Sequence, residues 1–313
     1  MKLAALLFAF AAATVQAAWP EKPIKVLIGY APGGSTDVVA RLLAPKIGEK
    51  LGQPMVIENK PGAAGDFAAE LMLQSPPDGY TLMMTTVAVH ALNPGLMKQK
   101  FNAIDDFTPI AMVASYPMIM IASPQSTFKT PAELKELAAK TPLFYSSSGV
   151  GSPGHLSGEL LRKSLNADLT HVPYKGGAPS VMAIMSGEAQ VNFATLPAVV
   201  PQIRGGKVRA IALASRERNS AVPDVPTLIE LGLADFEVGT WTGFIGPRGV
   251  PADVVKRIND AVAEVVNDPA VRKRLVDEGA EVKLMTSQEF GAFMRAENVR
   301  WGKVIKDAGI TPQ

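Results

Sequence analysis

Residues 24–51 read IKVLIGYAPGGSTDVVARLLAPKIGEKL, and this stretch decides the fold. Its first part, 24–30, is rich in Ile, Val and Leu and predicts a strand. The strand ends at Ala31-Pro32-Gly33-Gly34, after which apolar residues recur at helical spacing from about Ser35 to Leu51. Gly52 stands just past the last apolar position and predicts the end of the helix. A strand followed by a glycine loop and a helix is the unit of an α/β fold.

The same unit recurs along the chain, so we expect an α/β protein with largely parallel sheets. Capping boxes at Thr130–Glu133 and Thr286–Glu289 predict helix starts. Pro45 conflicts with the first helix and predicts a kink there. The C-terminal stretch is expected to be mostly helical. The further expected strands are 55–58, 81–86, 143–147, 170–173, 191–194 and 209–214.

The composition excludes several classes of protein. The 313 residues include 47% hydrophobic and 19% charged side chains, which is the composition of a folded chain and not of a disordered one. Lys and Arg number 31 against 29 Asp and Glu, so there is no basic surplus typical of nucleic-acid binding. The absence of cysteine excludes disulfides, thiol chemistry and cysteine-ligated zinc.

The N-terminus has the pattern of an export signal. Met1-Lys2 gives a positive start, an apolar run follows over 3–13, and Val15-Gln16-Ala17 is a small-residue cleavage pattern. We expect 1–17 to be a signal peptide removed near Ala17, which predicts a periplasmic protein. The alternative is a signal anchor that stays in the membrane, but the apolar run is shorter than the roughly 20 residues that span a bilayer.

The loop 30–37, between the first strand and the first helix, is the sharpest candidate binding feature. Gly33 and Gly34 allow close approach of the backbone to a ligand, and the amides that open the helix suit an anion such as a carboxylate. The alternative is a tight turn in which Ser35 or Thr36 caps the helix. Asp37 favours the helix start but would repel an anion placed too close.

A second loop of this kind, 146–155, also follows a strand and precedes a helix. Gly149, Gly151 and Gly154 satisfy the dinucleotide pattern G-x-G-x-x-G. Its position in mid-chain, the predicted export and the crowding by Pro153 argue against a dinucleotide, so we favour a small anion. Loop 59–65 and the strand end at Thr85-Thr86 are open to either ligand contact or turn chemistry.

The sequence gives little support to catalysis. The histidines His90, His155 and His171 show no metal-ligand spacing, and no nucleophile elbow or phosphate-binding Walker motif occurs. A dispersed triad using Ser152 and His155 stays open, because triads are defined by geometry. We therefore expect no enzyme activity, no cofactor and no metal.

Taken together, these motifs resemble the Bug, or TctC, family of extracytoplasmic receptors of the tripartite tricarboxylate transporter system. The resemblance covers nearly the whole mature chain and keeps the order of the motifs. Its motifs read WPEKPI at 19–24, YAPGGSTD at 30–37, VIENKPG at 56–62, SPPDGYTL at 75–82, GSPGHL at 151–156, HVPYKG at 171–176 and WTGFIGP at 241–247.

The resemblance implies a two-lobed, type II periplasmic-binding-protein fold of the Venus-flytrap kind. The two strand crossings are expected near Met118 and Trp241, with 18–118 and 244–313 in one lobe and 119–243 in the other. A carboxylate would be held between the lobes by amides, hydroxyls and water. The ligand-binding positions that it implies are Tyr30, Gly33, Gly34, Ser35, Thr36, Asp37, Thr85, Thr86, Ser147, Ser148, Ser152, His155, Tyr174, Ala194 and Thr195.

One motif departs from many relatives, which carry an acidic residue and an Asn within the motif that here reads Phe193-Ala194-Thr195-Leu196-Pro197. Ala194 cannot accept a hydrogen bond from a ligand ammonium. This departure predicts a carboxylate without an amino group, whether a di-, tri- or aromatic carboxylate.

The expected function is a monomeric periplasmic receptor that closes around a small organic carboxylate. Its expected partner is a two-component integral-membrane permease, and no nucleic acid is expected. Two alternatives belong to other classes of protein. One is an exported serine hydrolase using Ser152 and His155, and the other is a periplasmic sensor module that presents its closed form to a signalling partner.

Overall fold

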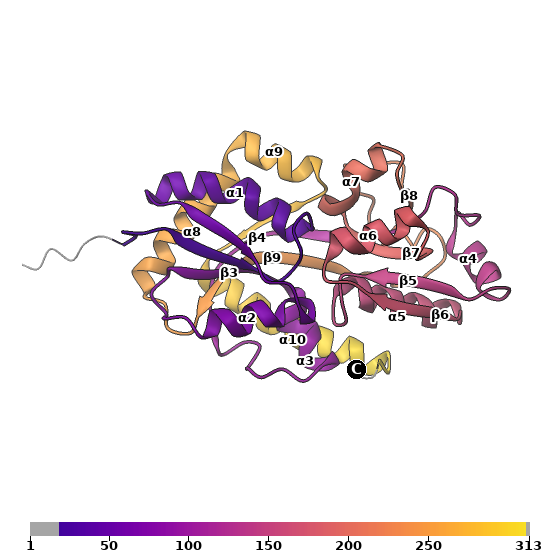
Figure 1. Ribbon diagram of the computed structural model, residues 1–313, viewed down its shortest axis with the longest axis horizontal. Coiled ribbons are helices and arrows are strands. Elements are labelled where there is room, and N and C mark those ends of the chain that lie inside the picture. Colours follow the sequence, from indigo (N-terminus) through magenta and orange to yellow (C-terminus); the bar gives the residue numbers. More distant parts are fainter. Residues whose placement is uncertain (1–18, 311–313) are drawn as a thin grey trace, which may run out of the picture.

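The computed structural model describes residues 19–310. The predicted signal peptide lies outside the described residues, as do the last three positions. Two lobes lie side by side along the long axis of the molecule (Figure 1), and each is a sheet with helices on both faces. Mixed α/β architecture in two lobes is therefore confirmed.

The first lobe is built on a mixed sheet with strand order β2-β1-β3-β9-β4, to which β10 adds along β4. Pairing is parallel where β1 meets β2 and β3, and antiparallel at β9 and β10. The strands are β1 (Ile24–Ile28), β2 (Met55–Asn59), β3 (Thr81–Thr86), β9 (Gly239–Pro247), β10 (Glu281–Met285) and the first part of β4 (Phe107–Ala122).

Helices cover both faces of this sheet (Figure 1). One face carries α1 (Ser35–Leu51), α8 (Ala252–Asn267) and α9 (Pro269–Asp277). The other carries η1 (Ala63–Gly65), α2 (Asp66–Leu73), η2 (Ala88–Leu92), α3 (Asn93–Leu96) and α10 (Ser287–Asp307).

The second lobe continues the sheet from the far end of β4 in the order β4-β7-β5-β6, with β8 also on β4. Its strands are β5 (Leu143–Ser147), β6 (Leu169–Pro173), β7 (Val191–Thr195) and β8 (Arg209–Leu213). Helix α5 (Pro153–Leu165) packs on one face, beside α4 (Pro131–Ala138), and α6 (Gly177–Ser186) and α7 (Leu196–Arg204) pack on the other.

Strand β4 belongs to both lobes. Its residues up to Pro117 pair with β9, and from Met118 onward it pairs with β7. The returning chain crosses beside it, where Val238 accepts a hydrogen bond from the Met118 amide at 3.0 Å. The lobes are thus joined by extended backbone, as the fold class requires; the exact boundaries at 118 and 243 stay a prediction.

Pro45 does not break the first helix, and the C-terminal stretch is mostly helical, as expected. Helix α1 runs through Pro45 as one helix, because Pro45 lies on its exposed side and the next buried residues, Ile47 and Gly48, stay in the helical pattern. The C-terminal stretch is helical except for β10, a short edge strand that exists because β4 offers it an antiparallel partner.

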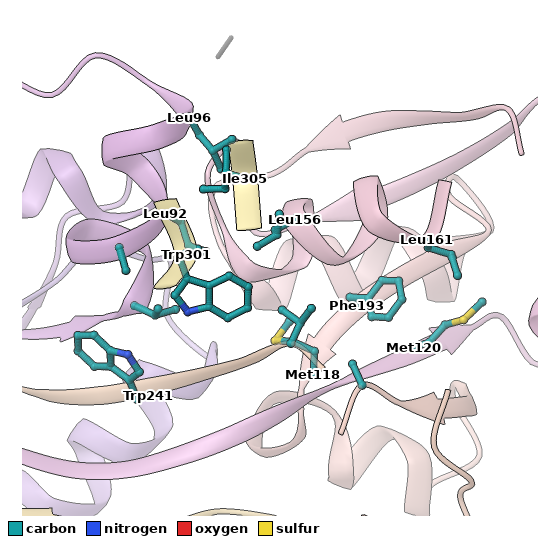
Figure 2. Packing of buried hydrophobic residues seen from close by; sticks show 14 of the residues in the cluster. Leu92, Leu96, Met118, Met120, Leu156, Leu161, Phe193, Trp241, Trp301 and Ile305 are labelled. Atoms are coloured by element: carbon teal, nitrogen blue, oxygen red, sulfur yellow. The ribbon is translucent and has the colours of Figure 1, made fainter. Parts of the chain in front are cut away.

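The largest apolar cluster extends across both lobes. Figure 2 shows Leu92, Trp301 and Ile305 of the first lobe near Leu156 and Met118, with Phe193 of β7 further along the same cluster. Each of these side chains is at most 3% exposed. The two lobes therefore share buried apolar surface in addition to their covalent crossings.

Candidate functional site

A cleft lies between the lobes, at the ends of strands from both. The first lobe contributes the end of β3 and the turn from β1 into α1, and the second contributes the ends of β5 and β7. Where the chain crosses between the lobes, Met118 and Thr240 add to the wall. The lining residues are Tyr30, Gly34, Ser35, Thr36, Thr86, Met118, Ser148, Pro153, Gly177, Ser180, Phe193, Ala194, Thr195 and Thr240.

No lining residue of this cleft carries a charge, yet four helices begin at it. Helix α1 opens at Ser35 from the first lobe, and α5, α6 and α7 open at Pro153, Gly177 and Leu196 from the second. The first amides of a helix lack intrahelical partners and give its N-terminus a partial positive charge. In α1, α6 and α7 no side chain caps these amides, so the cleft can accept an anion from both sides.

Asp37 holds the first-lobe loop from beneath and does not line the cleft. Its carboxylate accepts hydrogen bonds from the Gly33 amide at 2.9 Å, from Arg41 at 3.0 Å and from Asn59 at 2.9 Å. Burial opposes ionisation of Asp37, but these hydrogen bonds outweigh it and lower the pKa of the carboxyl below its usual value. The loop is therefore fixed by a charged group that is itself 3% exposed.

Tyr30 and Thr86 form one buried pair on the first-lobe wall. The Tyr30 hydroxyl donates to the carbonyl of Ala64 at 2.9 Å and lies 3.1 Å from Oγ1 of Thr86. Burial raises the pKa of Tyr30 to about 12, so the phenol is neutral. The preceding residue, Thr85, faces away from the cleft and pairs with His90 Nε2 at 2.9 Å, because successive strand residues point to opposite faces.

Of the second-lobe serines, Ser148 lines the cleft, whereas Ser147 and Ser152 lie behind it. The Ser147 hydroxyl bonds to Gly149 and lies 2.7 Å from His171 Nε2. Ser152 is the N-cap of α5 and accepts from the His155 amide at 3.2 Å. Both serines are fully buried and hold the loop in place.

His155 also lies behind the loop. Its Nδ1 accepts a hydrogen bond from the Gly151 amide at 3.3 Å, and its ring stacks on His171 with centroids 4.2 Å apart. Burial lowers the pKa of both rings, which keeps them neutral and keeps Nδ1 of His155 an acceptor. No hydrogen bond joins the Ser152 hydroxyl to this ring, so the pair lacks the geometry of a nucleophile and its base.

Tyr174 lines a second cavity next to the cleft, and Ser148 lines both. The other wall of the second cavity is the loop Gly62–Ala64, which the sequence left open between ligand contact and plain connection. Lys175 is the one charged residue among those that line either cavity. Two residues of the first loop that were predicted to bind the ligand, Gly33 and Asp37, do not line the cleft.

Six cleft residues were not predicted: Met118, Pro153, Gly177, Ser180, Phe193 and Thr240. Gly177 carries a signal that could have identified it, since Gly176-Gly177 repeats the pattern of strand, glycine pair and helix. Met118 and Thr240 lie at or next to the expected strand crossings, but nothing in the sequence marks them as cleft residues, because their position in the cleft depends on where the crossing strands lie in three dimensions.

The lobes touch beside this cleft. The Ala31 amide of the first lobe donates to the carbonyl of Lys175 in the second at 3.0 Å. At a further point Arg204 of α7 donates to the carbonyl of Asp277 at 3.1 Å.

Within residues 19–310, no group of three or more His, Asp or Glu side chains is arranged to hold a metal ion, and no helix is long and apolar enough to cross a membrane.

A two-lobed α/β molecule with a neutral, anion-accepting cleft between the lobes is a solute-binding protein, and the comparisons give its family. Residues 39–310 match the family described as the tripartite tricarboxylate transporter family receptor. The chain is also 31% identical to Protein BugT of Bordetella pertussis, over 93% of this chain and 90% of BugT. The chain belongs to this receptor family.

Solved structures agree with this assignment. The chain is similar to MatC from Rhodopseudomonas palustris with bound malate, at 35% identity and a TM-score of 0.88 over 92% of this chain and all of MatC. It is likewise similar to R. palustris Rpa4515 with adipate, at 33% identity and a TM-score of 0.91 over 95% of this chain and all of that protein. The family and these neighbours are solute-binding proteins, so this chain is not an enzyme.

Proposed function

We propose that this protein is a periplasmic receptor that captures a small organic carboxylate between its lobes and delivers it to a tripartite tricarboxylate transporter permease. One observation carries the proposal: uncapped helix N-termini from both lobes meet at a cleft that no charged side chain lines. A carboxylate would supply the missing hydrogen-bond acceptors. The malate and adipate in similar structures are of this class.

Neutral donors suit a receptor that must also release its ligand. A buried ion pair with Arg or Lys would be costly to break, whereas amides and hydroxyls exchange a carboxylate for water at small net cost. A ligand that touches both lobes binds the closed arrangement better than the open one and shifts the population toward it.

The wall around Ala194 narrows the class of ligand. Phe193, Ala194 and Met118 are largely apolar surfaces, and no lining residue is a carboxylate that would pair with an ammonium group. The proposed ligand is therefore a carboxylate without an amino group. Export to the periplasm with cleavage near Ala17, action as a monomer and handover to a two-component permease complete the proposal.

A thermal-shift screen of the mature, ligand-stripped protein tests this function. The panel contains malate, adipate, citrate, aromatic carboxylates, aspartate, glutamate and neutral sugars. A true ligand at about 100 times its Kd stabilises the fold by roughly 2.7 kcal/mol. We expect a response confined to carboxylates without an amino group; silence across all carboxylates, or a response to sugars alone, would overturn the proposal.

The variant Ala194→Asp tests the class of ligand separately. A carboxylate at this position repels a ligand carboxylate but can pair with an ammonium group. We expect the best wild-type ligand to bind Ala194→Asp at least tenfold more weakly, while aspartate loses less affinity or gains some, by calorimetric titration. Ala194→Ser is the control because it adds a small hydroxyl without charge. Equal losses for both ligands in Ala194→Asp would contradict the role of Ala194.

A further inference from the structure

Asn93 of the first lobe and Gly151 of the second meet across the gap between the lobes. Gly151 lies in the loop before α5, and Asn93 begins α3. A Cβ atom placed on Gly151 would stand 2.1 Å from Oδ1 of Asn93 and 2.8 Å from the terminal methyl of Met97. Only a residue without a side chain leaves room for this approach.

The Asn93 side chain is fixed in the first lobe. Its Nδ2 donates to Oδ1 of Asp66 at 2.6 Å and to the carbonyl of Ala63 at 3.2 Å. Gln99 donates to the same Asp66 oxygen at 3.1 Å. These bonds settle which amide atom is nitrogen, so Oδ1 is the atom directed at Gly151.

The contact is made without a hydrogen bond. Asn93 is fully buried, and its Oδ1 has no hydrogen-bond partner. A buried carbonyl oxygen without a partner is unfavourable, and separation of the lobes would return it to water.

On the second-lobe side, Gly151 belongs to the loop between β5 and α5, which also contributes to the wall of the cleft. The Gly151 amide donates to Nδ1 of His155, and the Ser152 amide donates to the carbonyl of Gly149 at 3.1 Å. Ser148, three residues before Gly151, lines the cleft. The position of Gly151 against Asn93 is therefore linked through a short, hydrogen-bonded loop to the wall that faces the ligand.

We propose that Asn93 and Gly151 form the closing contact of this receptor, at which the fixed amide of one lobe meets the bare backbone of the other and so sets how far the cleft can close. The proposal rests on the closing motion in the proposed function. It makes Asn93 and Gly151 positioning residues that act on affinity without touching the ligand.

Disulfide trapping measures closure without any ligand. The chain has no cysteine, so an engineered pair supplies the only thiols. A Cβ on Gly33 would stand 3.5 Å from Cβ of Ala178, across the gap between the lobes and within the range of a disulfide. The double variant Gly33→Cys/Ala178→Cys is treated with a mild oxidant. Its rate of cross-linking then reports how often the lobes reach the closed arrangement, even if they do so rarely.

In this background we expect Gly151→Ala to slow cross-linking at least tenfold. Gly187→Ala is the matched control: its φ of +82° equals the +81° of Gly151 within a degree, but nothing lies within 4 Å of the added methyl group. It should leave the rate unchanged. Adding Asn93→Ala to Gly151→Ala removes the obstructing oxygen and should restore most of the rate.

Equal rates for Gly151→Ala and Gly187→Ala would overturn the proposal, as would a reference pair that never cross-links. If Gly151→Ala fails to fold, Asn93→Gln lengthens the amide from the opposite side and should slow cross-linking likewise. Binding of adipate and malate is measured separately on the unmodified protein by calorimetric titration, because Gly33 lies in the loop that opens α1 and has a φ of +83°. Failure of both to bind would count against the proposed function and leave the closing contact to be judged by the variants alone.

Discussion

Asp37 and Asp66 are both at most 4% exposed in the first lobe, yet their environments push their ionisation in opposite directions. Asp37 receives donors from Gly33, Arg41 and Asn59, and its pKa is lowered. For Asp66 the loss of water outweighs the donors from Asn93 and Gln99, and its pKa is raised to about 6. The two residues therefore predict opposite effects of pH on stability.

A depressed pKa means that Asp37 stabilises the fold above its unfolded value, near pH 4, and that this contribution is lost as pH falls through the folded value. We expect Asp37→Asn to lower the free energy of unfolding by about 1–2 kcal/mol at pH 7. The difference from wild type should shrink as pH falls below about 4 in urea titrations. A difference that does not change with pH in this range would show that the charge of Asp37 is not the cause.

A raised pKa means that the stability contributed by protonated Asp66 is complete below about pH 4 and is lost as pH rises through about 6. Asp66→Asn keeps an acceptor for Asn93 and Gln99 without the buried charge. We expect it to raise the free energy of unfolding by about 2 kcal/mol at pH 7.5 and to match wild type near pH 4. Asp224→Asn, at an exposed position of the second lobe, is the control; a destabilised Asp66→Asn at pH 7.5 would contradict the prediction.

The sequence predicted the loops that form the site, but not which of two neighbouring residues in them faces the ligand. Glycine loops ahead of helices identified both walls of the cleft, because amides at a helix start need no particular side chain. The same reading could not separate Thr86 from Thr85, or Ser148 from Ser147. Neighbouring residues of a strand face opposite sides, so a shift of one position exchanges cleft and core.

At the scale of elements, the close approach of α5 to β5 depends on one glycine. A methyl group on Gly158 would stand 2.1 Å from the ring of Tyr145. Alanine favours a helix over glycine by about 1 kcal/mol, but this overlap costs more. We expect Gly158→Ala to lower the free energy of unfolding by about 2 kcal/mol, measured by urea denaturation.

Gly302 of α10 is the matched control for that prediction. It lies in a helix with nothing within 4 Å of an added methyl group. Gly302→Ala should therefore stabilise the protein by about 0.5–1 kcal/mol. Two variants with the same sign would mean that helix propensity, or a general loss of flexibility, decides the outcome instead of packing.

Elements with local signals were predicted well, and elements that depend on distant partners were not. Strands β1, β3 and β5 begin at the expected residues because each is an apolar run bounded by turn residues. Strand β10 has half-buried and exposed residues and exists through its pairing with β4. The π-helical turn η2 was likewise not foreseen, since its buried residues 88–92 have no periodicity that distinguishes it from an α-helix.

The whole molecule should unfold as one unit, although it has two lobes. Strand β4 pairs in both halves of the sheet, and the largest apolar cluster includes residues of both lobes. Unfolding of either lobe would expose apolar surface and strand edges of the other lobe that it now covers. We expect a single calorimetric transition without ligand, with equal calorimetric and van't Hoff enthalpies. Two separate transitions would contradict this coupling.

The pairing of β3 with β9 has a consequence for how the chain acquires its structure. Met83 pairs with Ile245, so the middle of the first-lobe sheet joins residues from opposite ends of the chain. The second lobe, in contrast, takes β5 to β8 from one continuous stretch. As the chain grows from the ribosome, the second lobe has all its strands, including the earlier β4, as soon as β8 has been made, and it can form before β9 exists. The strands made first, β1 to β3, must wait for β9, which makes them the part of the chain that a chaperone would need to shield.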